Sequence, residues 1–398
     1  MRTASRRACL AALVGLVFAA TGGCGAIIGL EAPFAESADD GDGRADDVVA
    51  QADTAVDDAP HDASVDTEGT RRVECLQGNL VHLDSSESLG APPSFGGNAG
   101  YLFGIVVDQR SADDVDAYVS IGNDYNGGAG RIYRITNDSP TWELFAETPS
   151  VSSQLQIASG YLFAGETSSV VRFRLDCPSP CTAEETATPA GLEPIDAFWA
   201  VSPDLAFVVP NSGALLRLSR SASGWASDEV GAIDAPAFYR SAAATDRALY
   251  VAQIGFPAAQ AFPFGADAGP TPRLDPPSEA GSPIVLADCD RVYLTGDTTF
   301  SFDPTTGIGH PIGSGASLYG RGIDENFIYV GLPNGGGFFR YRKDGMADAS
   351  EALSQNISVW GIGLSPDWIY YGEHGFNTCS GDAACPTTAA LFRRRKTP

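Results

Sequence analysis

Cysteines are the residues of this chain whose spacing most directly suggests chemistry. An even number of thiols favours disulfides in an exported chain, which the N-terminus described below predicts. Two pairs are close enough to close their own short loops, and the remaining two cysteines form a third pair by elimination. A redox or metal site would need paired CxxC spacing or neighbouring histidines, and neither occurs. The sequence therefore predicts three structural disulfides, Cys177 with Cys181, Cys379 with Cys385 and Cys75 with Cys289.

Signatures of catalysis are missing from the sequence. No HExxH metal motif and no GxSxG nucleophile motif occurs, and we expect no catalytic residue and no metal site. The four histidines lie far apart, and histidines in such loops are more often exposed than bound to metal. They are His61, His82, His310 and His374. No cofactor is predicted, although one group of acidic residues could bind calcium. These are Asp113, Asp114, Asp116 and Asp124.

One set of residues suggests recognition rather than catalysis. Aromatic side chains beside arginines are the groups that anchor peptides, sugars and anionic groups. In this chain they recur at the starts of short segments that are rich in small residues. The predicted ligand-binding set is Gln156, Trp199, Tyr239, Arg240, Tyr319, Arg321 and Trp360. The alternative is that the aromatic members pack between neighbouring repeats of the fold.

These segments belong to a unit that recurs seven times from residue 100 onward. Each unit has a run of small residues, then a run with a central aromatic residue, then a third run that often ends in arginine; a fourth, weaker run follows most of them. The aromatic markers are Tyr118, Phe163, Phe207, Tyr250, Tyr293, Tyr329 and Tyr370. Small side chains suit strands that crowd around an axis. The repeat predicts an all-β fold, a seven-bladed β-propeller of four-stranded antiparallel blades.

The two ends of the repeat region predict how the ring closes. The last repeat stops after its third run, ALFRRRKTP (390–398), whereas the β-like run Leu76–Leu83 precedes the first repeat without a partner. We predict that this run adds the outer strand of the last blade. Such a closure also removes an exposed sheet edge.

Residues 1–24 (MRTASRRACLAALVGLVFAATGGC) predict export. A positively charged start precedes an apolar run, Ala8–Ala20, that is too short for a permanent span but suits a signal peptide. Small residues and Cys24 follow, a pattern that resembles the bacterial lipoprotein signal. The resemblance implies cleavage before Cys24 and acylation of its thiol, and Gly25 favours the outer membrane. The alternative is a plain secretory signal cleaved near a cysteine.

Charge excludes some partners and defines a linker. The 398 residues carry 25 basic and 50 acidic side chains, a net charge of −25, which excludes electrostatic binding to nucleic acid or to an anionic membrane surface. Between Glu31 and Thr70 there are 13 acidic residues and one arginine, with too little apolar surface to fold. We therefore assign residues 1–24 to the signal peptide, 25–70 to a disordered acidic linker and 71–398 to the propeller.

The last two repeats carry a resemblance to known proteins. The segments DENFIYVGLPNGGGFFRYRKDG (324–345) and SPDWIYYGEHG (365–375) resemble exported bacterial β-propeller lipoproteins of the TolB-like and YncE-like kinds. We expect a monomeric propeller, lipid-anchored to the outer membrane, that binds a protein, peptide or glycan of the envelope or cell surface without catalysis. The alternative is a propeller enzyme, a hydrolase or lyase with a metal or carboxylate site at the channel mouth. Propellers host many functions, and their sites assemble from several blades.

Overall fold

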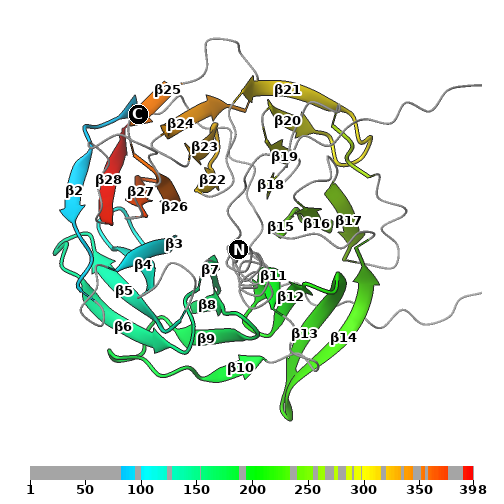
Figure 1. The fold of residues 1–398 in the computed structure, drawn as a ribbon, viewed down its shortest axis with the longest axis horizontal. Helices are drawn as coiled ribbons and strands as arrows, with labels where there is room; N and C mark the ends of the chain where they lie inside the picture. Colours follow the sequence, from blue (N-terminus) through cyan, green and yellow to red (C-terminus); the bar gives the residue numbers. More distant parts are fainter. Residues whose placement is uncertain are drawn as a thin grey trace, which may run out of the picture. The chain divides into compact units, whose positions relative to one another are not determined.

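The strand-like runs of the sequence form seven antiparallel sheets that surround a central axis as blades (Figure 1). The computed structural model describes residues 82–94, 100–122, 128–152, 154–187, 194–233, 240–253, 259–264, 273–276, 284–288, 291–296, 298–314, 320–332, 336–343, 351–354, 357–374 and 389–397. All belong to the second of two compact units, Gly69–Pro398. None of these residues forms a helix that is long and apolar enough to cross a membrane.

The first three blades each have four strands in sequence order from the axis outward. Blade 1 comprises β3 (Tyr101–Gln109), β4 (Val115–Gly122), β5 (Gly130–Thr136) and β6 (Glu143–Thr148). Blade 2 comprises β7 (Gln154–Ala158), β8 (Tyr161–Gly165), β9 (Val170–Arg174) and β10 (Glu185–Ala187). Blade 3 comprises β11 (Ile195–Ser202), β12 (Leu205–Pro210), β13 (Ala214–Ser221) and β14 (Gly224–Ala232).

The next three blades repeat this order. Blade 4 comprises β15 (Arg240–Ala244), β16 (Ala248–Gln253) and β17 (Ala259–Pro263). Blade 5 comprises β18 (Ile284–Ala287), β19 (Val292–Thr295), β20 (Thr298–Phe302) and β21 (Gly309–Ser314). Blade 6 comprises β22 (Arg321–Ile323), β23 (Phe327–Leu332), β24 (Gly337–Arg342) and β25 (Glu351–Ser354).

Blade 7 joins the two ends of the repeat region. Its strands are β26 (Val359–Leu364), β27 (Trp368–Glu373) and β28 (Ala390–Thr397), and β1 (His82–Leu83) and β2 (Glu87–Gly90) both pair antiparallel with β28. The predicted closure is confirmed, although the pairing falls on 82–90 and overlaps the predicted run only at its end. Arg393 reinforces it, since its guanidinium donates to Glu87 at 2.7 Å and to the Asn137 side chain of blade 1 at 2.7 Å.

The predicted seven-bladed propeller is therefore confirmed, with one correction to the uniform four-strand blade. Blade 7 has five strands, because the N-terminal segment adds two short ones. Blade 4 has three strands within the described part of the chain, and an isolated bridge between Ala259 and Leu274 follows its third strand.

The hydrophobic core lies between consecutive blades rather than inside one sheet. Each aromatic marker is buried on the second strand of its blade; Tyr118, for example, packs with Leu155 and Leu162 of blade 2. Burial of one such side chain stabilises the fold by about 1.5–3 kcal/mol. Small residues permit the closest approaches. A Cβ atom on Gly372 would lie 2.4 Å from Leu102 of blade 1.

The only two lysines of the chain join neighbouring blades. Lys396 of blade 7 forms an ion pair with Asp324 of blade 6 at 2.8 Å, and the Tyr329 hydroxyl donates to the same carboxylate at 2.7 Å. In blade 6, Lys343 pairs in the same way with Asp288 of blade 5, to which Tyr293 donates. We call these two groups the lysine clamps.

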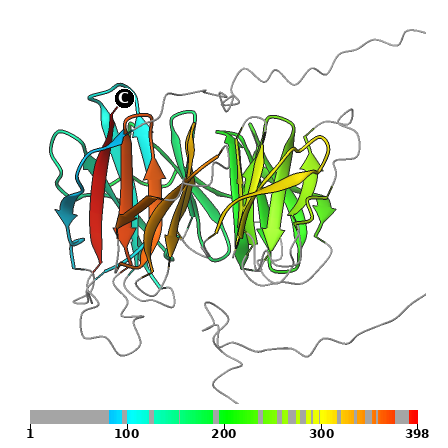
Figure 2. The ribbon, with the colours of Figure 1, turned by 90° about the horizontal axis from the view of Figure 1, so that it is seen from above.

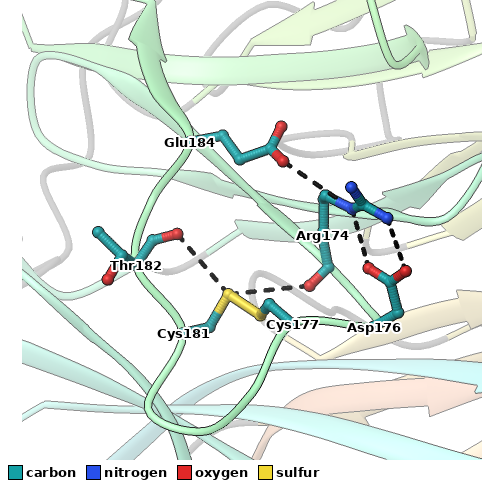
Figure 3. Close-up of a disulfide and its surroundings, with 6 residues drawn as sticks. All are labelled: Arg174, Asp176, Cys177, Cys181, Thr182 and Glu184. Carbon is teal, nitrogen blue, oxygen red and sulfur yellow. Dashed lines mark hydrogen bonds and ion pairs between the residues drawn. A yellow bond between two sulfur atoms is a disulfide. The ribbon is translucent and has the colours of Figure 1, made fainter.

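The predicted Cys177–Cys181 disulfide is present, with Cα atoms 5.6 Å apart (Figure 3). It closes the loop between β9 and β10, and Cys181 forms a parallel bridge with Ala146 on the outer strand of blade 1. The disulfide therefore shapes a loop of blade 2 that contacts the outer strand of blade 1. The other candidates, Cys75, Cys289, Cys379 and Cys385, lie outside the described residues, and their pairing stays a prediction.

Candidate binding site at the ring mouth

The inner strands of the seven blades face the axis, and we call the circle of their first residues the mouth (Figures 1 and 2). Of the predicted ligand-binding set, the side chains of Gln156, Trp199, Arg321 and Trp360 are described. Tyr239 and Tyr319 lie outside the described residues. Arg240 is placed by its backbone alone, as the first residue of β15. The four described side chains lie on four different inner strands.

Gln156 connects two blades through its side-chain amide. Nε2 donates to the Phe198 carbonyl at 2.9 Å, and Oε1 accepts from the Ala200 amide at 2.7 Å. Gln154 makes the equivalent pair of bonds to Asp196 and Phe198. Backbone N–H and C=O groups at the edge of a sheet need hydrogen-bond partners. Between blades 2 and 3, the two glutamine side chains supply these partners in the way that a neighbouring strand would. These bonds give Gln156 a structural role in addition to the predicted ligand contact, which stays a prediction.

Trp199 lies deeper in its blade than the sequence predicted. Strand β11 begins at Ile195, so Trp199 is its fifth residue rather than within two residues of the start. The indole is partly buried and packs against hydrophobic clusters on both sides of blade 4. This arrangement corresponds to the alternative in which the aromatic residues pack between blades.

Trp360 lies at the mouth, as the second residue of β26. It is half-buried and lies at a break in the strand register, between the paired residues Val359 and Gly361. Its ring stacks on His374 with centroids 3.9 Å apart, and Phe103 of blade 1 approaches it edge-on at 6.4 Å. The indole Nε1 donates to the Ser358 hydroxyl at 3.2 Å. One face of the ring is therefore fixed by the joint between blades 7 and 1.

At the end of β27 lie two adjacent buried titratable residues, Glu373 and His374, and the sequence expectation for His374 was wrong. We expected an exposed loop histidine, whereas His374 is fully buried, and its Nδ1 lies 2.5 Å from the Leu102 carbonyl. Burial lowers the pKa of His374 to about 4, against the opposing effect of that carbonyl. Burial raises the pKa of Glu373 to about 7, although a backbone hydrogen bond from Ser358 opposes the shift.

The equivalent position of blade 2 holds a second buried carboxyl. Glu166 lies three residues after the marker Phe163, as Glu373 lies three residues after Tyr370. Burial raises the pKa of Glu166, and the Ser169 hydroxyl donates to it at 2.8 Å. Neither residue was among those predicted from the sequence. Their shared spacing from the aromatic marker is the signal that could have identified them.

Arg321 is the first residue of β22 and is half-buried. Among the described residues it has no ion pair and no hydrogen bond through its guanidinium. Burial lowers its pKa to about 10, and no acidic group of the described residues opposes the effect. Within the described part of the chain, the positive charge of Arg321 on this inner strand therefore has no acidic partner.

Two of the four acidic residues considered for calcium, Asp114 and Asp116, already have a basic partner. The guanidinium of Arg110 bonds to Asp108 at 2.7 Å, to Asp114 at 2.5 Å and to Asp116 at 2.9 Å. The hydrogen bond from Arg110 holds the pKa of Asp114 below its usual range. Asp113 has no such contact to a base in the described part of the chain, and Asp124 lies outside it. No three His, Cys, Asp or Glu side chains of the described ranges gather as a metal site.

Comparison with known proteins identifies the fold. No protein-family model matches the chain, and no curated protein sequence matches it. The WD40 repeats of RRP9 match with a TM-score of 0.55 and 9% identity, over 80% of this chain and 100% of that one. The Pan2 WD40 domain of Neurospora crassa matches with a TM-score of 0.53 and 8% identity, over 74% and 89%. BamB from Moraxella catarrhalis has a TM-score of 0.47 and 12% identity, over 79% and 100%. At these identities the likeness extends to the β-propeller architecture.

Proposed function

We propose that this chain is a lipid-anchored binding propeller of the bacterial envelope, of the exported TolB-like and YncE-like kind. In this proposal Cys24 carries the lipid, residues 25–70 form a solvated spacer and the mouth binds a protein, peptide or glycan without catalysis. The signal-like N-terminus supports the lipid anchor, and the acidic composition of residues 25–70 supports the spacer. The rigid ring supports the binding role.

One observation carries the binding role. Arg321 and Trp360 are the first and second residues of β22 and β26, the inner strands of the adjacent blades 6 and 7. Both are half-buried, so each retains accessible surface, and by strand register Arg321 lies level with Ile362, two residues further along its strand than Trp360. Arginine and tryptophan are the residues most enriched among the strong anchors of interfaces.

The binding role is tested by variants of the mouth. Partners are first cross-linked to the full chain in detergent-solubilised envelopes, and the affinity of the purified partner is then measured. Arg240→Ala and Arg321→Ala should each weaken binding by about thirtyfold, the equivalent of ~2 kcal/mol, and leave the melting temperature near that of the wild type. Arg131→Ala, on the outer part of blade 1, is the matched control. Unchanged affinity in both mouth variants would exclude the proposed site.

The anchor is tested separately. Cys24→Ser should abolish acylation and either release the protein from the membrane fraction or leave it unprocessed. Metabolic labelling with a fatty-acid probe, followed by fractionation, gives the readout. Undiminished label in the variant would show that Cys24 is not the lipid site.

A further inference from the structure

Strand register places Arg321 where the other blades have apolar side chains. Arg321 pairs with Val330, one residue after the marker Tyr329. Paired residues point to the same face of a sheet, and Val330 is fully buried. The equivalent residues of the other blades are Ile105, Leu155, Phe198, Ala242, Val285 and Ile362. All of them except Ala242 are buried members of the clusters between blades.

Arg321, which is half-buried, also differs from the buried arginines and lysine of the described residues. Those bases each form an ion pair: Arg172 with Asp204, Arg340 with Glu351, Arg393 with Glu87 and Lys396 with Asp324. A charge that is moved out of water without a partner destabilises the folded state. In Arg321 this cost is not offset by any group of the described chain.

The joint that Arg321 faces lies between blades 5 and 6, because the equivalent residues of the other blades face the preceding blade. Within the described residues, its hydrophobic cluster has three buried members, Leu286, Tyr293 and Ile328, and the partly buried Ile312 and Ile323 pack against them. An apolar residue at position 321 would extend this cluster, as Leu155 and Ile362 extend theirs. The sequence instead has a cation there, at the cost of apolar packing.

We propose that Arg321 is an oxyanion-binding residue, which receives a carboxylate or phosphate group of the ligand at the joint between blades 5 and 6. The inference rests on the proposed binding function and names the chemistry of its ligand. A guanidinium offers two parallel N–H donors to a carboxylate or phosphate, and such pairs are strong where water is partly excluded. In a chain with a net charge of −25, attraction of an anion depends on this local group rather than on the overall field.

The direct test uses small probes on the full chain at low ionic strength. One arm titrates inorganic phosphate, and another titrates an acetylated tetra-alanine with a free C-terminal carboxylate against its C-terminal amide. Calorimetry should show that the wild type binds phosphate or the peptide acid, with the amide at least about tenfold weaker. The arm that binds identifies the source of the oxyanion. Absence of binding in both arms, or equal binding of acid and amide, would overturn the inference.

Two substitutions separate binding from folding. Arg321→Leu should abolish probe binding and raise Tm by a few degrees, since leucine restores the apolar residue of the other blades. Arg321→Gln should also abolish binding, with Tm close to the wild type. Arg131→Gln, which breaks an exposed pair with Glu147, should leave binding unchanged. Retained affinity in both Arg321 variants, or a lower Tm in Arg321→Leu, would show that the arginine is a structural residue.

The same variants distinguish this inference from the proposed function. If the cross-linked partner binds Arg321→Leu as tightly as the wild type but loses Trp360→Ala, the oxyanion role fails and the binding propeller stands. If no partner is found and the probes still bind through Arg321, the oxyanion site stands and the ligand is a small anion.

Discussion

At the scale of single residues, the paired shifts of Glu373 and His374 are the most unusual chemistry of the ring. The two residues are adjacent in sequence and both are buried, yet burial moves their pKa values in opposite directions. The carboxyl binds its proton more tightly in the folded state, and the imidazole binds it less tightly. Their contributions to the pH dependence of stability therefore oppose each other.

We expect Glu373→Gln to reveal this opposition. Between about pH 4.5 and 7 the folded state holds the Glu373 proton that the unfolded chain releases, so its contribution to stability falls as pH rises. The loss amounts to at most about 3 kcal/mol. His374 acts oppositely between about pH 4 and 6.5, where its contribution rises with pH. Urea unfolding of the variant should show stability that rises to pH 6.5 and then stays level. Glu143→Gln, an exposed site, is the control, and a decline of the variant above pH 6.5 would contradict the assignment.

At the scale of elements, the lysine clamps connect the turns of one blade to the third strand of the next. Lys396 and Asp324 are both largely buried, with the ammonium also hydrogen-bonded to the Ser365 carbonyl at 2.8 Å. Burial would raise the pKa of Asp324, but Lys396, Tyr329 and backbone donors outweigh it and hold the pKa below its usual range. This carboxylate therefore stabilises the fold above the pKa of the unfolded chain, and the contribution is lost on acidification.

Lys396→Met should destabilise the propeller by about 3–5 kcal/mol, because it leaves Asp324 buried without its cation. Adding Asp324→Asn should recover part of the loss, since the amide can keep hydrogen bonds without a charge. Arg131→Met, which breaks an exposed ion pair, should cost less than about 1 kcal/mol. Denaturant unfolding of the four proteins gives the comparison. A double variant no more stable than Lys396→Met alone would contradict the clamp as an ion pair.

The strands of this protein could be predicted far better than the environments of its side chains. All seven aromatic markers lie on the second strand of a blade, because alternation and the repeat period constrain strands strongly. The depth of Trp199 depends on where β11 begins, which local sequence does not determine. The burial of His374 depends on blade 1, 272 residues away in sequence, through Leu102. Contacts between blades are non-local in sequence. The position of Gln156 on an inner strand could therefore be predicted, whereas its hydrogen bonds to the backbone of blade 3 could not.

At the scale of the whole molecule, closure of the ring depends on residues from both ends of the propeller. Strands β1 and β2 pair with β28, and Arg393 connects this blade to blade 1. The β-ladder and the ion pair with Glu87 therefore act on the same joint.

Deletion of residues 82–90 should lower the melting temperature by several degrees, because it exposes the edge of β28 and leaves the partly buried Arg393 without Glu87. Deletion of residues 25–70, the predicted linker, should leave the melting temperature unchanged. Scanning calorimetry of the two deletions gives the test. Equal melting of the 82–90 deletion and the wild type would show that the ring is stable without this closure.

The shared blade also sets a temporal order for synthesis. Strands β1 and β2 emerge from the ribosome among the first structured residues, yet their partner β28 emerges among the last. The first six blades can form pairwise contacts as elongation proceeds, whereas the seventh joint must wait for residues 390–397. A chain interrupted by a premature stop would thus keep an open sheet edge that quality-control proteases and chaperones can recognise. Completion of the ring reports that translation has passed β28.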